Sequence, residues 1–327
     1  MNWQGKRVLV TGAGGFIGSH LVERLVELGA NTRALVRYRA TGAWGWLDHS
    51  ACRKDVQVFA GDLVDRDCVV RAVQDRDVIF HLGALIAIPY SYEAPLSYVR
   101  TNVEGTLNVL QAARQSEVER VIHTSTSEVY GTARQVPIGE DHPLQGQSPY
   151  AASKIAADKM AEAFHLSFGV PVVTVRPFNT FGPRQSARAV IPTVIMQGLV
   201  HRRVRLGNVE PTRDFNYVSN TVDGFICAAA SDQAVGRVVN FGSGSEIKIR
   251  SLVEAIGRLM GVPIEIVTDE ERIRPIASEV ERLLADTRLA EKLLDWTPAV
   301  SLEDGLRLTI EWIKKHPEYY RPELYAI

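Results

Sequence analysis

The chain has little of what marks several common classes of protein. It has only three cysteines in 327 residues, at positions 52, 68 and 227. This odd and widely spaced set excludes a disulfide framework and fits a reducing compartment. No cluster of cysteine and histidine has the spacing of a metal site, so we expect no bound metal. The apolar runs are short, Phe225–Ala230 being typical, and none approaches the ~20 residues of a membrane-spanning helix.

The chain also lacks an excess of charge of either sign. Its 37 Lys+Arg against 38 Asp+Glu give a formal net charge of −1, which removes any global attraction to nucleic acid or to an anionic membrane. Lys6 and Arg7 precede an apolar stretch, but glycines interrupt it at once, unlike a secretory signal. We therefore expect a cytoplasmic protein with small-molecule partners.

What is present is an alternation of short β-rich runs and helical patterns, which favours an α/β fold with a doubly wound parallel sheet. Strands are expected at Arg7–Thr11, Thr32–Val36, Val56–Ala60, Val78–His81, Arg120–Ser125 and Val172–Val175, and helices at Phe16–Leu28, Asp65–Val73, Pro95–Ser116 and Pro149–Phe168.

After Pro177 this alternation weakens, because glycines and prolines interrupt it. We expect a first domain over residues 1–180 and a smaller C-terminal lobe over 181–327. Val238–Phe241 resembles a buried strand and is a candidate to rejoin the first sheet.

A glycine-rich turn follows the first strand. Gly12, Gly15 and Gly18 stand there, with Phe16 and Ile17 opening the helix. Glycines permit a tight turn and the close approach of a pyrophosphate, which then lies at the helix N-terminus. A purely structural strand–helix turn is the alternative, but the place at the start of a βαβ unit favours dinucleotide binding.

A second motif, YxxxK, places Tyr150 and Lys154 on one face of a helix. Ser148 is a good N-cap and Pro149 a good first helical residue. A lysine ammonium beside a phenol favours the phenolate and so lowers the pKa of the tyrosine. By itself the pair could be a solvated helix face. Downstream of a dinucleotide loop, it indicates an acid–base catalyst.

Three polar residues, Thr126, Ser127 and Glu128, follow the fifth expected strand. Ligands of open parallel sheets bind beyond the carboxyl ends of the strands, so we expect this triplet to face the substrate. The alternative is that the hydroxyls cap the strand and the carboxylate is a solvated loop residue.

The GxxGxxG spacing within TGAGGFIG and the YxxxK motif resemble the extended short-chain dehydrogenase/reductase superfamily, in its NAD-dependent epimerase/dehydratase family. The resemblance runs from Arg7 to about Ile313. Four stretches, Val8–His20, Arg33–Tyr38, Ser125–Gly131 and Val175–Ala189, look most like nucleotide-sugar 4,6-dehydratases that act on nucleotide-linked N-acetylglucosamine in legionaminic-acid-type pathways. The resemblance implies a Rossmann-like dinucleotide-binding domain and a substrate-binding lobe.

The resemblance also implies the cofactor and substrate contacts. Tyr150 and Lys154 would contact a tightly bound, recycled NAD(P), as would Gly12, Gly15, Phe16, Ile17, Gly18, Asp62, Leu63, Leu82 and Ala84. Arg37 stands where NAD-preferring relatives usually have Asp, which mildly favours NADP. The substrate side would be formed by Asn179, Arg184, Arg213 and Arg274, the arginines gripping a diphosphate.

Two further expectations concern activity and assembly. Relatives with Thr-Ser-Glu after this strand include dehydratases and glucuronate decarboxylases, whereas simple 4-epimerases generally lack the Glu. A 4,6-dehydratase is our first interpretation, with Thr126, Ser127, Glu128, Tyr150 and Lys154 as catalytic residues. The alternatives are a UDP-glucuronate decarboxylase, then a 4-epimerase, and lastly a silent dinucleotide-binding regulator.

A homodimer is expected through a four-helix bundle, as in this family. The two helices carry apolar residues beyond one stripe: Leu107, Val109, Leu110, Ile155, Met160, Ala161 and Phe164.

Overall fold

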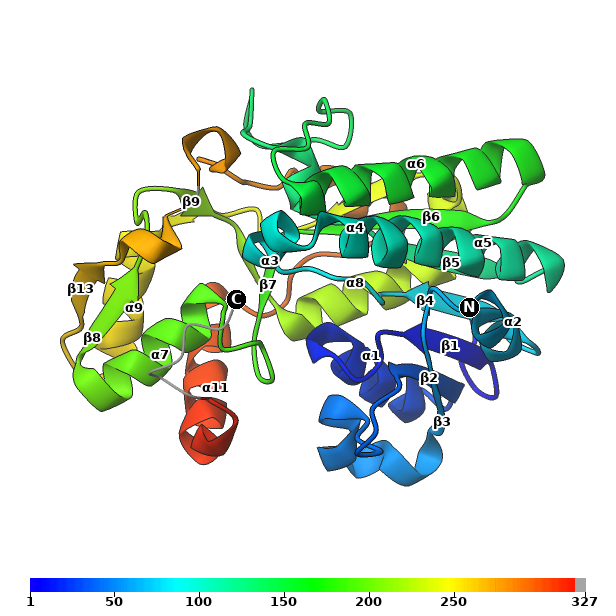
Figure 1. The fold of residues 1–327 in the computed structure, drawn as a ribbon, viewed down its shortest axis with the longest axis horizontal. Coiled ribbons are helices and arrows are strands. Elements are labelled where there is room, and N and C mark those ends of the chain that lie inside the picture. Colours follow the sequence, from blue (N-terminus) through cyan, green and yellow to red (C-terminus); the bar gives the residue numbers. More distant parts are fainter. Residues whose placement is uncertain (274, 321–327) are drawn as a thin grey trace.

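The computed structural model describes residues 1–273 and 275–320. The described residues form a central parallel sheet of seven strands, ordered β11-β6-β5-β4-β1-β2-β3 (Figure 1). Its strands are β1 Arg7–Thr11, β2 Asn31–Arg37, β3 Gln57–Gly61, β4 Val78–His81, β5 Arg120–Thr124, β6 Val172–Pro177 and β11 Val238–Phe241. Every neighbouring pair is parallel. The predicted doubly wound sheet is therefore confirmed.

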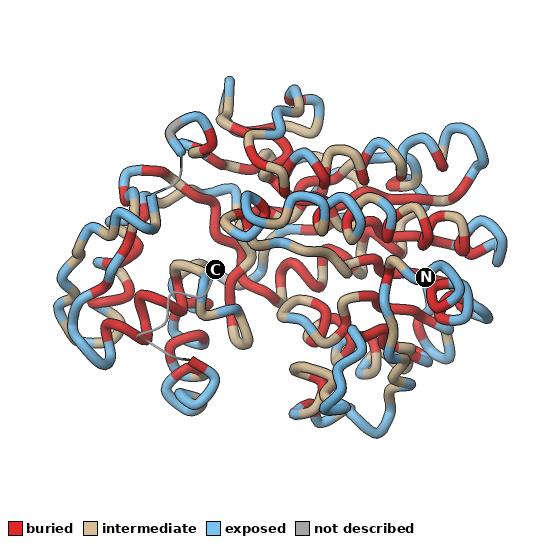
Figure 2. The backbone as a smooth tube through the Cα atoms, viewed as in Figure 1, coloured by how far each residue is buried: buried red, intermediate tan, exposed pale blue. Residues whose placement is uncertain are grey.

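Helices cover both faces of this sheet because successive side chains of a strand point to opposite sides. In β1, Leu9 packs beneath one layer of helices, whereas Val8 and Val10 pack against the other layer. The first layer contains α2 Arg66–Val73, α5 Gly105–Gln115 and α6 Pro149–Phe168; the second contains α1 Phe16–Glu27 and α8 Val218–Ala230. Figure 2 shows the buried segments concentrated in the strands between these layers.

The helix expected over Pro95–Ser116 differs from the prediction. It consists of α4 Pro95–Tyr98, a π-helical turn η3 over Val99–Glu104, and α5. A π turn carries one extra residue per turn and is often found at functional sites. Here it contains Asn102, whose side chain turns inward and is almost fully buried.

The second half of the chain is built from shorter pieces. The described part of it contains three two-stranded sheets, which pair β10 with β7, β12 with β9 and β13 with β8. Their strands are β7 Asn179–Phe181, β8 Arg203–Leu206, β9 Thr212–Arg213, β10 Phe215–Tyr217, β12 Ile247–Lys248 and β13 Glu265–Thr268. The α-helices of this part are α7 Val190–His201, α9 Ile249–Met260, α10 Arg288–Leu294 and α11 Leu302–Lys315, whereas α3 Ile88–Glu93 belongs to the first half.

Two features join the halves of the chain. β11 comes from the second half but pairs with β6 of the first, with Asn240 opposite Arg176. One hydrophobic cluster also runs from Val8 and Phe80 of the sheet to Leu252 and Ile313. The division at residue 180 thus separates two lobes that share a core; as a domain boundary it remains a prediction.

The apolar residues from which we expected a helix bundle lie mostly inside the subunit. Val109, Leu110, Ala161 and Phe164 are at most 6% exposed and belong to the cluster between helices and sheet. The interpretation of these four as surplus apolar surface was wrong, because α5 and α6 pack against each other and the sheet, which buries more than one stripe of each.

Within residues 1–273 and 275–320, no helix combines the length and apolar character needed to cross a membrane. The same residues contain no group of three or more His, Cys, Asp or Glu side chains arranged to hold a metal ion.

Candidate active site

The predicted dinucleotide turn lies at the carboxyl end of β1. Gly12 has a φ of 68°, and a Cβ there would lie 2.8 Å from the backbone N of Gly83, which follows β4. The turn therefore requires glycine, since any side chain would collide with the neighbouring loop. In the described chain, no side chain caps the start of α1 and its first turn holds no acidic residue. Its N–H groups are thus available to an anion, which fits the pyrophosphate of a dinucleotide.

The other predicted cofactor residues lie at the carboxyl ends of the strands beside β1. Arg37 ends β2 and is exposed, and Asp62 follows β3, where its Oδ1 accepts from the N–H of Val64 at 3.0 Å. Leu63 is buried beside Asp62. Leu82 and Ala84 are half-buried after β4. The order β4-β1-β2-β3 places all of these at one edge of the sheet, as a bound dinucleotide requires.

The YxxxK motif lies at the start of α6. The Oγ of Ser148 accepts from the N–H of Ala151 at 3.1 Å and so caps the helix. Both Tyr150 and Lys154 are buried, and Lys154 Nζ donates to the carbonyl of Thr124 at 2.6 Å. Burial lowers the pKa of Lys154 to about 8. This lysine is therefore still charged near neutral pH.

Tyr150 connects this helix to the predicted catalytic triplet. Burial raises the pKa of Tyr150, a hydrogen bond with the Thr126 side chain opposes that rise, and the charge of Glu128 adds to it. The phenol therefore lies next to Thr126 and within the field of Glu128. Because burial works against the phenolate, a nearby positive charge is needed for Tyr150 to act as a base.

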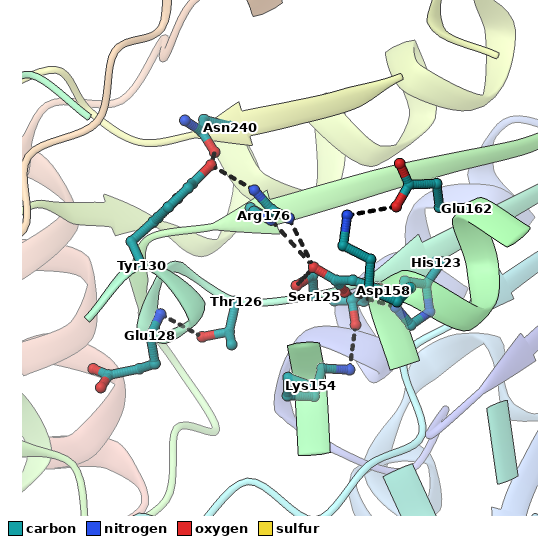
Figure 3. Close-up of polar contacts among 12 residues, drawn as sticks. His123, Ser125, Thr126, Glu128, Tyr130, Lys154, Asp158, Glu162, Arg176 and Asn240 are labelled. Atoms are coloured by element: carbon teal, nitrogen blue, oxygen red, sulfur yellow. Dashed lines mark hydrogen bonds and ion pairs between the residues drawn. The ribbon is translucent and has the colours of Figure 1, made fainter. Parts of the chain in front are cut away.

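The triplet itself forms the start of a short 3₁₀ helix, η4, over Ser127–Tyr130. Thr126 is its N-cap, and its Oγ1 accepts from the N–H of Glu128 at 3.2 Å. Thr126 and Ser127 are buried, whereas Glu128 is half-buried. In Figure 3 the Glu128 carboxylate points away from the buried cluster around Asp158. This turn therefore presents a hydroxyl and a carboxylate next to the phenol of Tyr150.

Asn102 connects the loop that follows β4 to the helix that carries the YxxxK motif. Its Nδ2 donates to the carbonyl of Leu85 and to Ser153 Oγ, both at 2.9 Å, and its Oδ1 accepts from the N–H of Leu85 at 2.8 Å. Ser153 Oγ donates in turn to the carbonyl of Tyr150 at 2.7 Å. The π turn aims the Asn102 amide at these groups, so the loop after β4 and the YxxxK helix are held in a fixed relation.

A buried polar cluster behind Lys154 was missed by sequence reasoning. Its centre is Asp158, whose carboxylate contacts His123, Ser125 and Arg176 (Figure 3). Arg176 Nη1 also donates to the hydroxyl of Tyr130 at 2.9 Å. One signal was present: Asp158 lies four residues after Lys154, so an acid stands on the helix face that carries the motif.

The predicted substrate residues lie in different surroundings. Asn179 begins β7, and its buried Oδ1 has no hydrogen-bond partner among the described residues. Arg213 is buried in β9, where it donates to the carbonyl of Thr212 at 2.9 Å and contacts Glu279 at 3.3 Å. Arg184 contacts α1 through Glu23 at 2.8 Å. Arg274 lies outside the described residues.

Comparison with known proteins agrees with this geometry. A family model described as GDP-mannose 4,6 dehydratase matches residues 9–309. A UDP-glucose 4-epimerase from Mycolicibacterium smegmatis is 34% identical, over 94% of this chain and 98% of the relative. A UDP-N-acetyl-alpha-D-glucosaminuronate decarboxylase from Bacillus cytotoxicus is 31% identical, over 95% and 98%.

A solved structure is similar over nearly the whole chain. It is the dTDP-glucose 4,6-dehydratase of Streptomyces venezuelae, with NAD bound, which gives a TM-score of 0.87 at 29% identity and covers 97% of this chain and 99% of that one. The family model, the relatives and the glycine turn beside a buried YxxxK helix lead to one conclusion: the chain belongs to the NAD-dependent epimerase/dehydratase superfamily, whose members here are nucleotide-sugar enzymes with the extended short-chain dehydrogenase/reductase fold.

Proposed function

We propose that the chain is a nucleotide-sugar 4,6-dehydratase, acting on UDP- or GDP-linked N-acetylglucosamine to give a 4-keto-6-deoxy sugar nucleotide. The observation that carries this proposal is Glu128. The residue is half-buried, its backbone N–H donates to Thr126 Oγ1 at 3.2 Å, and its charge raises the pKa of the Tyr150 phenol. A second acid–base group at this place is needed for elimination of water but not for a simple oxidation.

The first half of the reaction would use Tyr150, Lys154 and Thr126. Tyr150 would take the proton of the sugar 4-hydroxyl, and Thr126 would hydrogen-bond the same oxygen. Lys154 would hold the cofactor ribose and favour the phenolate through its charge. A bound nicotinamide supplies a reversible hydride acceptor, which allows oxidation at C4 and later return of the hydride to C6.

The second half would use Glu128 and Ser127. The 4-keto group acidifies the C5 proton, and Glu128 would remove it. Water would then leave from C6, with the proton supplied by Glu128 itself or through Ser127, which is buried next to it. C5 would regain a proton as the hydride adds to C6, which balances the proton that was taken from the 4-hydroxyl. The substrate diphosphate would be held by Asn179 and Arg213, with Arg184 and Arg274 as further predicted contacts.

The test is Glu128→Gln, which keeps the shape of the side chain and removes its basicity. General-base assistance typically contributes ~10²–10⁴-fold, so dehydration should slow by about that factor. Hydride transfer should survive, so reduced cofactor should accumulate and be seen by the absorbance of its reduced nicotinamide. Glu162→Gln, at an exposed position of α6, is the control and should behave as the parent. Dehydration at the parental rate by Glu128→Gln would remove the main support for the proposal.

A second candidate, a UDP-glucuronate decarboxylase, is favoured by the Thr-Ser-Glu triplet that such enzymes share and by the decarboxylase relative. A 4-epimerase comes third. Mass spectrometry of products from UDP-, GDP- and dTDP-linked sugars separates the three. Loss of water supports the dehydratase, loss of carbon dioxide the decarboxylase, and unchanged mass with altered stereochemistry the epimerase.

We also propose that NADP is accepted and mildly favoured over NAD. The support is Arg37, exposed at the end of β2, where a cation would attract a 2′-phosphate and an acid would repel it. The cofactor released on denaturing the purified protein tests this, since wholly NAD contents would contradict it.

Two remaining proposals concern assembly and location. A homodimer through the outward faces of α5 and α6 is supported by the exposed apolar side chains Leu96 and Val99 at the start of the same helical segment. A monomeric mass by light scattering at micromolar concentration would contradict it. A cytoplasmic location is supported by the free thiols of Cys52, Cys68 and Cys227, and cell fractionation would test it.

A further inference from the structure

Asp158 is a buried carboxylate to which the proposed mechanism gives no role. Its side chain is 5% exposed, yet both oxygens are bound. Oδ1 lies 3.0 Å from His123 Nε2, and Oδ2 accepts from Ser125 Oγ at 2.7 Å and from Arg176 Nη2 at 2.9 Å. A buried carboxylate costs several kcal/mol to desolvate unless such partners surround it. Three polar side chains therefore stabilise one buried charge here, and this arrangement needs an explanation.

The place of these partners along β5 provides that reason. His123 and Ser125 stand on either side of Thr124, whose carbonyl accepts the hydrogen bond from Lys154 at 2.6 Å. Ser125 is followed directly by Thr126, which hydrogen-bonds Tyr150. One carboxylate thus fixes the strand end that contacts both residues of the YxxxK motif.

We propose that Asp158 is a positioning residue for the reaction: its carboxylate holds the end of β5 in place and is the counter-charge that keeps the Lys154 ammonium charged behind Tyr150. The predicted effect of Asp158 on turnover rests on the proposed function, whereas its predicted effect on the charge of Lys154 does not.

The surrounding charges agree with this role. Burial lowers the pKa of Lys154, and Asp158 opposes that lowering. Although burial would raise the pKa of Asp158, the hydrogen bond from His123 and the charges of Arg176 and Lys154 lower it to about 2, so Asp158 is ionised across the working pH range. The titratable groups that interact with Lys154 come from β4, β5 and α6: His81, His123 and Asp158. Arg176 of β6 contacts Asp158 from the other side of this group. Burial lowers the pKa of both histidines, so Asp158 is the negative charge of this group.

The first experiment measures Lys154 directly, in NAD-loaded protein without sugar nucleotide. The chain is labelled with ¹³C-lysine, and the Cε resonance of Lys154 is assigned by its loss in Lys154→Met. In Asp158→Asn, the midpoint of that titration should fall by roughly one to three pH units, as expected when a nearby opposite charge is removed. Tyr130→Phe is the matched control. It removes a hydroxyl that accepts from Arg176 and donates to Asn240 but leaves every contact of Asp158, so the Lys154 midpoint should not move.

The second readout is the pH profile of turnover. Loss of activity on the alkaline side should move to lower pH in Asp158→Asn by the same amount as the Lys154 midpoint, which a purely structural role would not cause. An unmoved Lys154 midpoint overturns the inference.

If Asp158→Asn does not fold, Arg176→Gln gives a second test, in which the Lys154 midpoint should move in the opposite direction. Without its arginine partner, the carboxylate should raise the Lys154 midpoint, and an unchanged or lower one overturns the inference. Absence of turnover with every sugar nucleotide would overturn the proposed function, while the titration would still decide the role of Asp158.

Discussion

The two lobes of the molecule are built on different principles. The first rests on a seven-stranded parallel sheet, in which the central strands are almost fully buried. The second rests on two-stranded sheets with strands of two to four residues. Thr126, Tyr150 and Lys154 stand on the continuous sheet and its helix, whereas Asn179 and Arg213 stand on the short strands. A rigid sheet suits groups that must meet reacting atoms within a fraction of an ångström, and short pieces can vary with the ligand. If the proposed roles of these residues hold, the type of chemistry belongs to the first lobe and the choice of substrate to the second.

The sharpest test of this division is Tyr150→Phe, in the first lobe. Removal of the phenol hydroxyl should lower the rate of hydride transfer by about 10²–10⁴-fold for every sugar nucleotide tried. Unlike Glu128→Gln, this variant should show no accumulation of reduced cofactor in a single turnover followed by absorbance. Tyr90→Phe, at an exposed position, should be neutral. A loss confined to one nucleotide would break the comparison, because it would make Tyr150 a specificity residue.

The next effect concerns stability, and it too arises in the first lobe. Burial lowers the pKa values of His81 and His123 below the ordinary value of 6.5. The unfolded chain therefore binds more protons than the folded chain below about pH 6.5, so stability is full above that pH and is lost as the pH falls. Together, His81 and His123 contribute at most ~2.7 kcal/mol per pH unit to the slope of unfolding free energy against pH.

Urea unfolding between about pH 7.5 and 5.5 measures this slope. His123→Gln should make it shallower. His316→Gln, at a site of the second lobe well outside the sheet, should leave it unchanged. Equal slopes in the parent and in His123→Gln would contradict the prediction.

A smaller effect is expected for the cofactor. Arg37→Asp should shift preference from NADP toward NAD by about tenfold, because an acid at the end of β2 hydrogen-bonds a ribose hydroxyl and repels a 2′-phosphate. The ratio of dissociation constants for the two cofactors, measured by quenching of tryptophan fluorescence, checks this. Arg39→Asp, in the same exposed loop, serves as the comparison. An unchanged ratio in Arg37→Asp would mean that other residues determine the choice between NADP and NAD.

The smallest effect belongs to the second lobe. Asn179→Ala should raise KM by about 3–10-fold with little change in kcat, since one hydrogen bond is worth ~0.5–1.5 kcal/mol net. Asn179 has a buried oxygen without a partner among the described residues, so folding alone should lose little from the substitution. Initial rates over a range of substrate concentrations separate the two constants, and a fall in kcat alone would place Asn179 with the catalytic groups instead.

Residues that begin and end helices explain why the first lobe was predictable from sequence. The helix Pro149–Phe168 has the predicted bounds because Ser148 caps one end and Gly169, with a φ of 69°, ends the other. The strand Val78–His81 was also predicted with its observed ends. In the second lobe, strands such as β9 and β12 have two residues each, which is too short for any periodicity to show.

The missed features depend on contacts distant in sequence. The π turn at Asn102 exists because its amide meets Leu85 and Ser153, neither of which is a sequence neighbour. Asp158 has the appearance of an ordinary polar helix residue until Arg176 and His123 are brought to it by β6 and β5. The apolar residues of α5 were wrongly interpreted as surface for the same reason. A helix that is covered on two sides buries more than one apolar stripe, and the sequence does not show what covers it.

The pairing of β11 with β6 has a consequence for synthesis of the chain. When the ribosome has completed residues 172–177, the strand beside β6 has not been made, and it arrives more than sixty residues later, at Val238–Phe241. Until then, a nascent chain that has folded the rest of the sheet would carry a free apolar edge at β6, the kind of edge that recruits other strands. Chaperone contact during elongation would protect that edge, and the last strand would close the sheet only after residues 181–237 of the second lobe had emerged.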